Sequence, residues 1–337
     1  MLTKSQLLNN VTKFLVAFNI AATCLLISPK LPAQSTAVTA SGKTTALFNA
    51  IRSGSPDLLK AQIANGADVN DSINSYSALM AATLNGSIDQ MKILIEHGAN
   101  VNYQTSGGIS ALWLAIPDAE KTILLLEHGA DINHQVQGYG VLAKLAAIPG
   151  TINLFHLLID KGADLKKSAP ANFLVYNAAS SGDTAILGYL LRNGFNAKDT
   201  AAFGDYPLNA ALSFRSFATL KMLVDNGADV NVKAPSFFEA LVGFTPLMNA
   251  AIYNERKSFF YLLEHGADPN LKSKKGFTAL MLLEQSETID DPDMTLALIN
   301  HGAIVSAKAQ DGTDALYYAM KKGNTQSAEL LKKYANK

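Results

Sequence analysis

Cysteine is nearly absent from this sequence, since Cys24 is the only one among 337 residues. A single cysteine cannot form a disulfide within the chain or supply the thiolates of a cysteine-built zinc site. Neither sign of charge is in surplus, because 28 Lys and Arg residues balance 28 Asp and Glu residues. Nucleic-acid-binding domains normally carry a basic surplus, so the balance argues against that class. Hydrophobic residues make up 48% of the chain, which predicts a sizeable core and excludes wholesale disorder.

Acidic residues are missing from the beginning of the chain, where the first is Asp57. The apolar run Phe14 to Ile27 follows two lysines and leads into a segment of small residues that ends at Ala33. A basic start, a short apolar run and a small-residue exit are typical of a secretory signal peptide. We therefore predict a cleaved signal at 1–33, a short linker at 34–42, and export to a periplasm or the cell exterior. Cleavage after Ala40 is a second option.

A membrane anchor and a lipidated cysteine are the alternatives to a cleaved signal in this segment. Residues 14–28 could remain as a membrane anchor, but the run is shorter than the roughly 20 residues of a spanning helix. Asn19 and Thr23 also interrupt it. Lipidation of Cys24 is disfavoured because Ala21-Ala22-Thr23 is a poor lipobox. After cleavage we expect no contact with a membrane.

A repeat dominates the rest of the chain. Glycines that open a Gly-Ala-Asp-x-Asn signature or a variant of it recur at intervals of 31 to 39 residues, at Gly66, Gly98, Gly129, Gly162, Gly194, Gly227, Gly266 and Gly302. A second signature of the type Thr-Ala-Leu or Thr-Pro-Leu precedes each of them. Together they predict nine units, which start near residues 45, 77, 110, 141, 173, 206, 245, 278 and 314.

Each unit reads as two helices and a turn. Hydroxyl or carboxyl side chains such as Thr45, Ser77 and Thr245 are suited to cap the first helix. Pro246 then occupies the first helical position, where a missing N–H costs nothing. The recurring glycine ends the second helix, because glycine readily adopts the left-handed conformation found there. About a dozen residues connect each glycine to the next unit.

These signatures resemble those of the ankyrin-repeat family, most closely in Thr245–Ala251 followed by Leu262–Asp268. The resemblance implies an all-α solenoid over 43–337, built of about nine helix-turn-helix units joined by β-hairpin-like turns. No unit keeps the family's motif histidine, and at that position we expect Trp113 to be partly buried. The family also implies binding of proteins through the concave face and the turns.

Motifs for catalysis are not found in the sequence, which has no G-x-S-x-G elbow, H-E-x-x-H pair or phosphate-binding loop. Four histidines directly precede a repeat glycine, where a helix C-terminus favours them. His134, with His128 and Asp131, fits metal-ligand spacings poorly. The acidic segment from Glu284 to Asp293 lacks calcium-loop spacing, and we interpret it as a solvated insertion. We predict no enzyme activity, cofactor or metal.

Aromatic residues in the turns are the candidates for partner binding, since aromatic anchors often dominate interfaces. The turn between units six and seven is six residues longer than usual and carries Phe237 and Phe238, which could instead pack back onto the solenoid. Three others directly precede a capping position, and the rest are weaker candidates. The full set is Phe237, Phe238, Tyr76, Phe244, Phe277, Phe203, Tyr103 and Tyr253.

The resulting hypothesis is an exported, monomeric ankyrin-repeat protein that binds one or more partner proteins without catalysis. One alternative is a membrane-tethered structural scaffold, which requires the first forty residues to stay attached. The other is an enzyme with a site in the groove, which requires convergent ionisable residues with shifted pKa values.

Overall fold

The computed structural model describes residues 41–169, 172–201, 205–234, 242–285 and 290–335. The predicted signal peptide and most of the linker lie outside these residues, as do Phe203, Phe237 and Phe238. The chain divides into two compact units on either side of residue 170. We describe the first unit over 41–169 and the second over 172–335.

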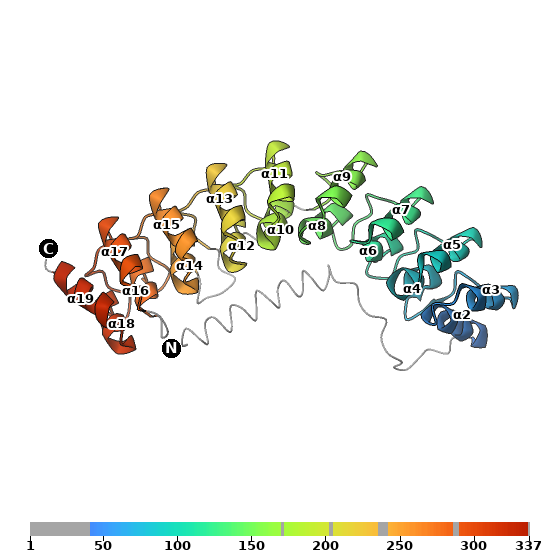
Figure 1. Cartoon of the computed structure of the whole chain (residues 1–337), viewed down its shortest axis with the longest axis horizontal. Coiled ribbons are helices and arrows are strands. Elements are labelled where there is room, and N and C mark those ends of the chain that lie inside the picture. The colour runs from blue at the N-terminus through green and yellow to red at the C-terminus, as the bar shows by residue number, and fades with distance from the viewer. Residues whose placement is uncertain (1–40, 170–171, 202–204, 235–241, 286–289, 336–337) are drawn as a thin grey trace. The chain divides into compact units, whose positions relative to one another are not determined.

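The first unit holds four helix pairs and one small hairpin (Figure 1). Its helices are α2 (Gly42–Arg52), α3 (Pro56–Ala64), α4 (Ala78–Asn85), α5 (Ile88–Glu96), α6 (Ala111–Ala115), α7 (Ala119–Glu127), α8 (Val141–Ala146) and α9 (Ile152–Asp160). Strands β1 (Ser72–Ile73) and β2 (Tyr76–Ser77) pair antiparallel in the turn before α4. Elsewhere in this unit the turns form isolated bridges, such as Gln104 with Ser110.

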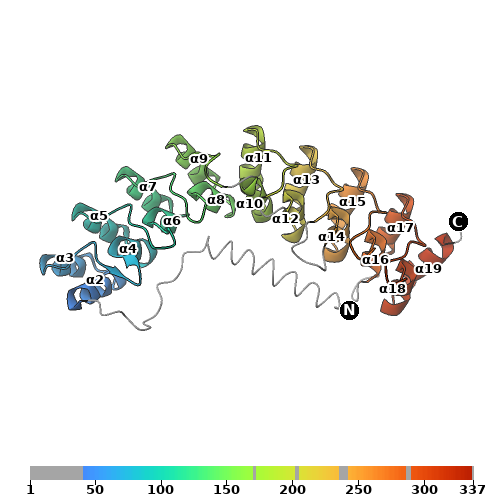
Figure 2. The same ribbon diagram turned by 180° about the vertical axis from the view of Figure 1, so that it is seen from behind.

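The second unit holds five helix pairs, seen from the other side in Figure 2. They are α10 (Phe173–Ser181) and α11 (Thr184–Arg192), α12 (Pro207–Ser213) and α13 (Phe217–Asp225), α14 (Pro246–Tyr253) and α15 (Arg256–Glu264), α16 (Ala279–Glu284) and α17 (Pro292–Asn300), and α18 (Ala315–Lys322) and α19 (Thr325–Tyr334). In this unit each first helix contacts the next first helix, and each second helix contacts the next second helix. Apart from one short hairpin and isolated bridges, the regular structure of the described residues is helical, and the predicted all-α repeat fold is confirmed.

In most of the nine repeats, the first helix is capped by the side chain that the sequence predicts. The hydroxyls of Ser77 and Thr245 accept hydrogen bonds from the backbone N–H three residues ahead, at 3.2 and 3.3 Å. Such caps stabilise a helix by about 1 kcal/mol. The prediction for Thr45 was wrong: α2 begins at Gly42, and its cap is Ser41, which accepts from the N–H of Thr44 at 3.1 Å. The helix starts one turn early because Ser41 offers an equivalent capping hydroxyl.

The recurring glycines take the conformation that their position requires. All eight have φ between +80° and +97°, in the left-handed region. A residue with a Cβ is strained there, which explains why the position is glycine in these eight repeats.

Leucines of the second signature are buried in the first eight repeats, whereas Leu316 of the ninth is half-buried. Eight of them are at most 2% exposed: Leu47, Leu79, Leu112, Leu142, Leu174, Leu208, Leu247 and Leu280. A buried leucine contributes about 1.5–3 kcal/mol through the apolar surface removed from water. Each of these eight leucines lies in the first helix of its repeat.

Asparagines in the turns connect neighbouring repeats. In the first unit, the Asn102 side chain donates to the Gly129 carbonyl at 2.8 Å and accepts from the Asp131 N–H at 2.8 Å. Asn70, Asn133, Asn231 and Asn270 form the same pair of bonds with the repeat that follows each of them. We call these contacts the asparagine ladder. They pair backbone groups of the turn that follows each second helix with a side chain of the preceding turn.

Two consecutive turns lack this asparagine. Lys166 follows Gly162 at the ladder position, and Lys198 follows Gly194. Among the described residues neither ammonium group forms a hydrogen bond or ion pair. The ladder is thus interrupted at the end of the first unit and at the beginning of the second.

Candidate functional site

The candidate turn aromatics occupy different environments. Tyr76, Tyr103 and Phe277 are half-buried in their turns. The ring of Phe277 lies 6.1 Å from that of Tyr318 in the following repeat. A partner contact at these three residues stays a prediction.

Phe244 does not lie on the surface. Its side chain is only 2% exposed, and its carbonyl accepts from the Ala234 N–H at 2.8 Å, which closes the long turn. The sequence interpretation of Phe244 as a partner-facing residue is therefore corrected to a core role. Tyr253 ends α14, and burial raises its pKa to about 12. Its side chain is half-buried, like those of Tyr76, Tyr103 and Phe277.

Trp113 is buried, in agreement with the prediction from its motif position. Its carbonyl accepts a 2.6 Å hydrogen bond from Lys144 Nζ, which also lies 5.2 Å from the indole ring centre. Lys144 is itself only 1% exposed. Burial lowers the pKa of Lys144 to about 7, because a low-dielectric environment disfavours the charged ammonium.

Glu284 is a second buried ionisable residue, which the sequence placed in a solvated segment. It is 1% exposed, so that interpretation was wrong for this residue. Its carboxyl accepts hydrogen bonds from Thr295 Oγ1 at 2.6 Å and Asn324 Nδ2 at 3.0 Å. Burial raises the pKa of Glu284 to about 7, against the effect of these donors.

The neighbouring acidic residues also have structural tasks. Asp291 caps α17 by accepting from the Met294 N–H at 3.1 Å, and it pairs with Arg256. Asp290 accepts from the Gln326 N–H at 2.8 Å at the start of α19. Together these carboxylates tie α17 and α19 to their neighbours, which explains why an acidic run occurs here.

Asp205 lies in the turn just before α12. It accepts hydrogen bonds from Asn209 Nδ2 at 2.9 Å, the Tyr206 N–H at 2.8 Å and the Tyr176 hydroxyl at 3.3 Å. Burial raises the pKa of Asp205, whereas these donors lower it. Because both carboxylate oxygens are occupied by neighbours, the group acts as a structural anchor between α10 and α12.

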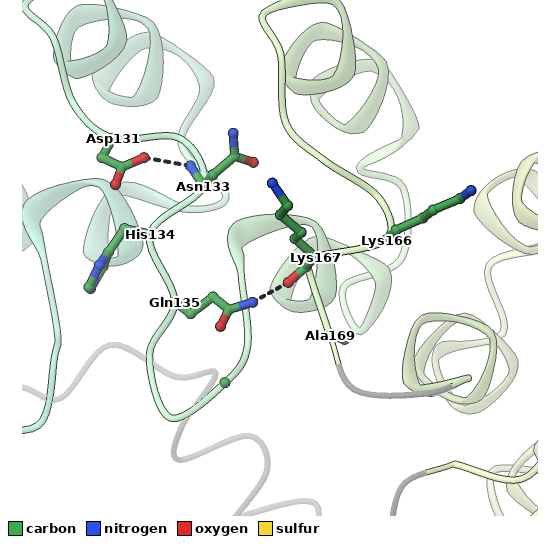
Figure 3. A pocket seen from close by; sticks show the side chains of 8 residues that line it. Asp131, Asn133, His134, Gln135, Lys166, Lys167 and Ala169 are labelled. Atoms are coloured by element: carbon green, nitrogen blue, oxygen red, sulfur yellow. Dashed lines mark hydrogen bonds between the residues drawn. The ribbon is translucent and has the colours of Figure 1, made fainter.

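A polar pocket lies in the first unit, between the turn that follows α7 and the turn that follows α9 (Figure 3). Its volume is about 790 Å³. We call it the turn pocket; it is lined by Asp131, Asn133, His134, Gln135, Gly138, Lys166, Lys167 and Ala169. Lys167 extends toward the polar side chains of the other turn, whereas the side chain of its neighbour Lys166 extends away from them (Figure 3).

His134 has a defined tautomer in this pocket. Its Nε2 lies 2.6 Å from the Gly108 carbonyl oxygen, so Nε2 carries the proton and donates. Its Nδ1 lies 3.2 Å from Gln104 Nε2 and therefore accepts. Both ring nitrogens are engaged with the preceding turn, which leaves neither available as a metal ligand. Within the described ranges, no group of three or more His, Cys, Asp or Glu side chains could hold a metal ion.

The four histidines predicted at helix ends form one common contact. Nδ1 of each lies 2.7 to 2.8 Å from the carbonyl oxygen four residues earlier, in His97, His128, His265 and His301. The rings thereby satisfy carbonyls at the ends of their helices, as the sequence predicts. This use is structural.

A family model described as ankyrin repeats (3 copies) matches residues 47–136, 142–234, 175–273 and 247–337. The chain belongs to the ankyrin-repeat family. Ankyrin repeats generally mediate protein–protein interactions and are typically non-enzymatic. No curated protein matched the chain. No helix in the described part of this ankyrin-repeat protein has the length and apolar character needed to span a bilayer.

Sequence reasoning did not identify the turn pocket. A signal for it was present, since Lys166 stands where Asn70, Asn102 and Asn133 stand in the preceding repeats. A departure from a regular pattern at an exposed turn indicates a local task other than stacking.

Proposed function

We propose that this ankyrin-repeat protein is exported and binds a partner protein through its turns and first helices, without catalysis. The observation that carries the proposal is the asparagine ladder, which holds successive turns in fixed register. A surface that is ordered before binding loses little conformational entropy when a partner docks. The half-buried aromatics Tyr103 and Phe277 lie in the turns and can serve as anchors.

Capture from the native cells tests the binding proposal. The full chain, tagged at its C-terminus, would be cross-linked in the cell and purified, and its partners identified by mass spectrometry. We expect one protein to be enriched with the wild type and lost with the Tyr103→Ser/Phe277→Ser variant. Leu58→Ser is the matched control, because Leu58 is half exposed on the second helix α3. Equal retention by both variants would locate binding elsewhere on the molecule.

Export rests on the composition of residues 1–40 and needs its own experiment. N-terminal sequencing of the protein from fractionated cells should find a start at Gln34 or Ser41. An intact Met1 in the membrane fraction would instead support the tethered scaffold.

A further inference from the structure

We propose that the exposed end of the last repeat binds an acidic amphipathic helix of the partner protein. This inference rests on the proposed function, since it names one structural element of the partner. It is carried by three observations on α18 and α19, the last helix pair of the second unit (Figure 1). Core-type side chains are exposed on α18, the same face of the preceding first helices packs against a helix, and lysines surround the exposed side chains.

The exposure of α18 departs from the pattern of the repeats before it. Tyr317 and Met320 are 46% and 61% exposed. The residues at the same positions of the two preceding repeats are each 1% exposed: Met281 and Glu284 in α16, and Met248 and Ala251 in α14. In α14 and α16 these positions are thus covered, whereas in α18 they hold apolar and aromatic side chains that face solvent.

The contacts of Glu284 show which element covers this face. Its carboxyl accepts from Asn324 Nδ2 at 3.0 Å, and Asn324 directly precedes α19 of the following repeat. Helix α16 also packs against α18, as α14 packs against α16. Met320 occupies the position of Glu284 in the last repeat. A helix is therefore the occupant that the geometry of the stack fits at this position.

The exposed face has a basic edge. Tyr317, Met320 and Lys321 lie three and four residues apart, on one side of α18, and we call them the end face. Lys321 Nζ lies 5.3 Å from the centre of the Tyr317 ring. From Ala315 to Tyr334 the chain has one acidic residue, Glu329, against four lysines: Lys321, Lys322, Lys332 and Lys333. An apolar patch beside a surplus of lysines favours an occupant that carries both leucines and carboxylates.

Nearby carboxylates are engaged with partners other than Lys321. Of the three aspartates around the start of α17, Asp290 accepts from N–H groups of α19 and the other two pair with Arg256. Asp314 caps α18 by accepting from the Tyr317 N–H at 2.9 Å. The Lys321 ammonium donates to the Tyr317 hydroxyl at 3.3 Å. The positive charge at the end face is therefore available to a carboxylate of the occupant.

A second copy of this chain fits the end face less well than a single helix does. Helices α18 and α19 have 8 and 10 residues, and helices of this size span about 12 and 15 Å. Such an end is small beside the roughly 800 Å² that each partner buries in a stable interface. Two end faces in contact would also bring lysines of like charge together. One acidic helix, as part of a larger interface, avoids both difficulties.

Fluorescence anisotropy on the full-length protein tests the end face. The probe is a short labelled helical peptide with leucines on one side and glutamates elsewhere. We expect saturable binding that Tyr317→Ser/Met320→Ser weakens about tenfold and Lys321→Glu about threefold. The matched controls are Leu58→Ser, at a half-exposed leucine of α3, and Lys60→Glu, at an exposed lysine of the same helix. Both should bind as the wild type does, and a peptide with lysines in place of glutamates should not bind.

No binding by the wild type, equal binding of the two peptides, or equal weakening by variants and controls would overturn the proposal. A dimer in light scattering that Tyr317→Ser/Met320→Ser abolishes would assign the end face to a second copy and overturn it. Binding to vesicles of anionic phospholipid that this variant abolishes would assign the end face to a membrane surface and also overturn it.

The native capture experiment separates this inference from the proposed function. A partner retained by Tyr317→Ser/Met320→Ser as strongly as by the wild type overturns the end face but leaves the partner-binding function in place. A partner lost with this variant and retained by Leu58→Ser, together with binding of the glutamate peptide, supports both.

Discussion

Lys144 in the first unit and Glu284 in the second are both buried on a first helix, yet they carry opposite charges and are held differently. The Lys144 ammonium donates to the Trp113 carbonyl and lies near the Trp113 ring. Glu284 accepts from Thr295 on the second helix of its own repeat and from Asn324 in the next repeat. The polar contacts of Lys144 described here are thus with Trp113, whereas Glu284 belongs to a network that spans two repeats.

The pH response of the two groups runs in opposite directions. Lys144 has a pKa of 10.5 when unfolded and about 7 when folded, so the unfolded chain holds more protons between these values. The free energy of unfolding therefore decreases as pH falls from 10.5 to about 7, and the cost is complete below that. Glu284 shifts from 4.5 to about 7, and the folded chain holds more protons in that range. Its cost grows as pH rises from 4.5 to about 7 and persists above.

The difference teaches that each unit places an ionisable group where stacking alone would favour an apolar one. Buried charges are often less stabilising than well-packed apolar residues. The two units therefore have separate weak points, which substitutions can expose one at a time.

The largest loss of stability is expected when a core leucine is removed. Leu247→Ala in the second unit and Leu79→Ala in the first should each lower the free energy of unfolding by about 2–5 kcal/mol, because both side chains are fully buried. Chemical denaturation measures the loss. A change below about 0.5 kcal/mol at either site, which is typical of surface positions, would contradict the repeat register.

Lys144→Met tests the first unit. The thioether chain fills a similar volume without charge, so we expect a gain of about 1–4 kcal/mol at pH 7. The pH dependence between 10.5 and about 7 should also be lost. Lys60→Met, at an exposed lysine of α3, is the control and should leave stability unchanged. A destabilised Lys144→Met protein would mean that the contact with Trp113 outweighs the cost of burial.

Glu284→Gln tests the second unit. Glutamine resembles the protonated acid, so the variant should be more stable than the wild type by about 1–3 kcal/mol above pH 7 and lose the dependence between pH 4.5 and about 7. Glu264→Gln, at an exposed glutamate of α15, serves as the control. The test is to measure the free energy of unfolding of both proteins across this pH range. If it depended on pH equally in the wild type and in Glu284→Gln, burial of Glu284 would not be the cause of the instability.

The smallest loss of stability is expected when the asparagine ladder is broken. Asn102→Ala and Asn270→Ala each remove two hydrogen bonds between exposed turns, and we expect a loss of about 1 kcal/mol in either unit. Lys198→Ala removes no described contact and should change stability by less than about 0.5 kcal/mol. If Lys198→Ala cost as much as Asn102→Ala, the ladder would not be the source of the effect.

Much of this fold was predictable because the same residue types recur at the same position in successive repeats. The glycines, most caps and the eight core leucines follow from residue type and spacing. Thr45 was misassigned because Ser41, one turn earlier, has the same capping chemistry. Repetition did not help there, since both residues fit the pattern.

The site was less predictable because it depends on contacts between repeats. Phe244 looks like an exposed turn residue in the sequence, and only the closed turn with Ala234 reveals its burial. Glu284 belongs to an acidic run, and its burial follows from α19 packing against it through Asn324. The sequence alone shows that Lys166 replaces a ladder asparagine. Only the tertiary structure shows that the turn at Asp131–Gly138 lies opposite it across the turn pocket.

Hydrogen exchange of the full-length protein, alone and bound to the captured partner, tests the central claim of binding through turns and first helices most directly. The account predicts slower exchange in turns such as 131–140 and 164–169 and in first helices such as α4 and α14, with the second helices unchanged. Protection confined to second helices such as α5 and α15 would contradict it.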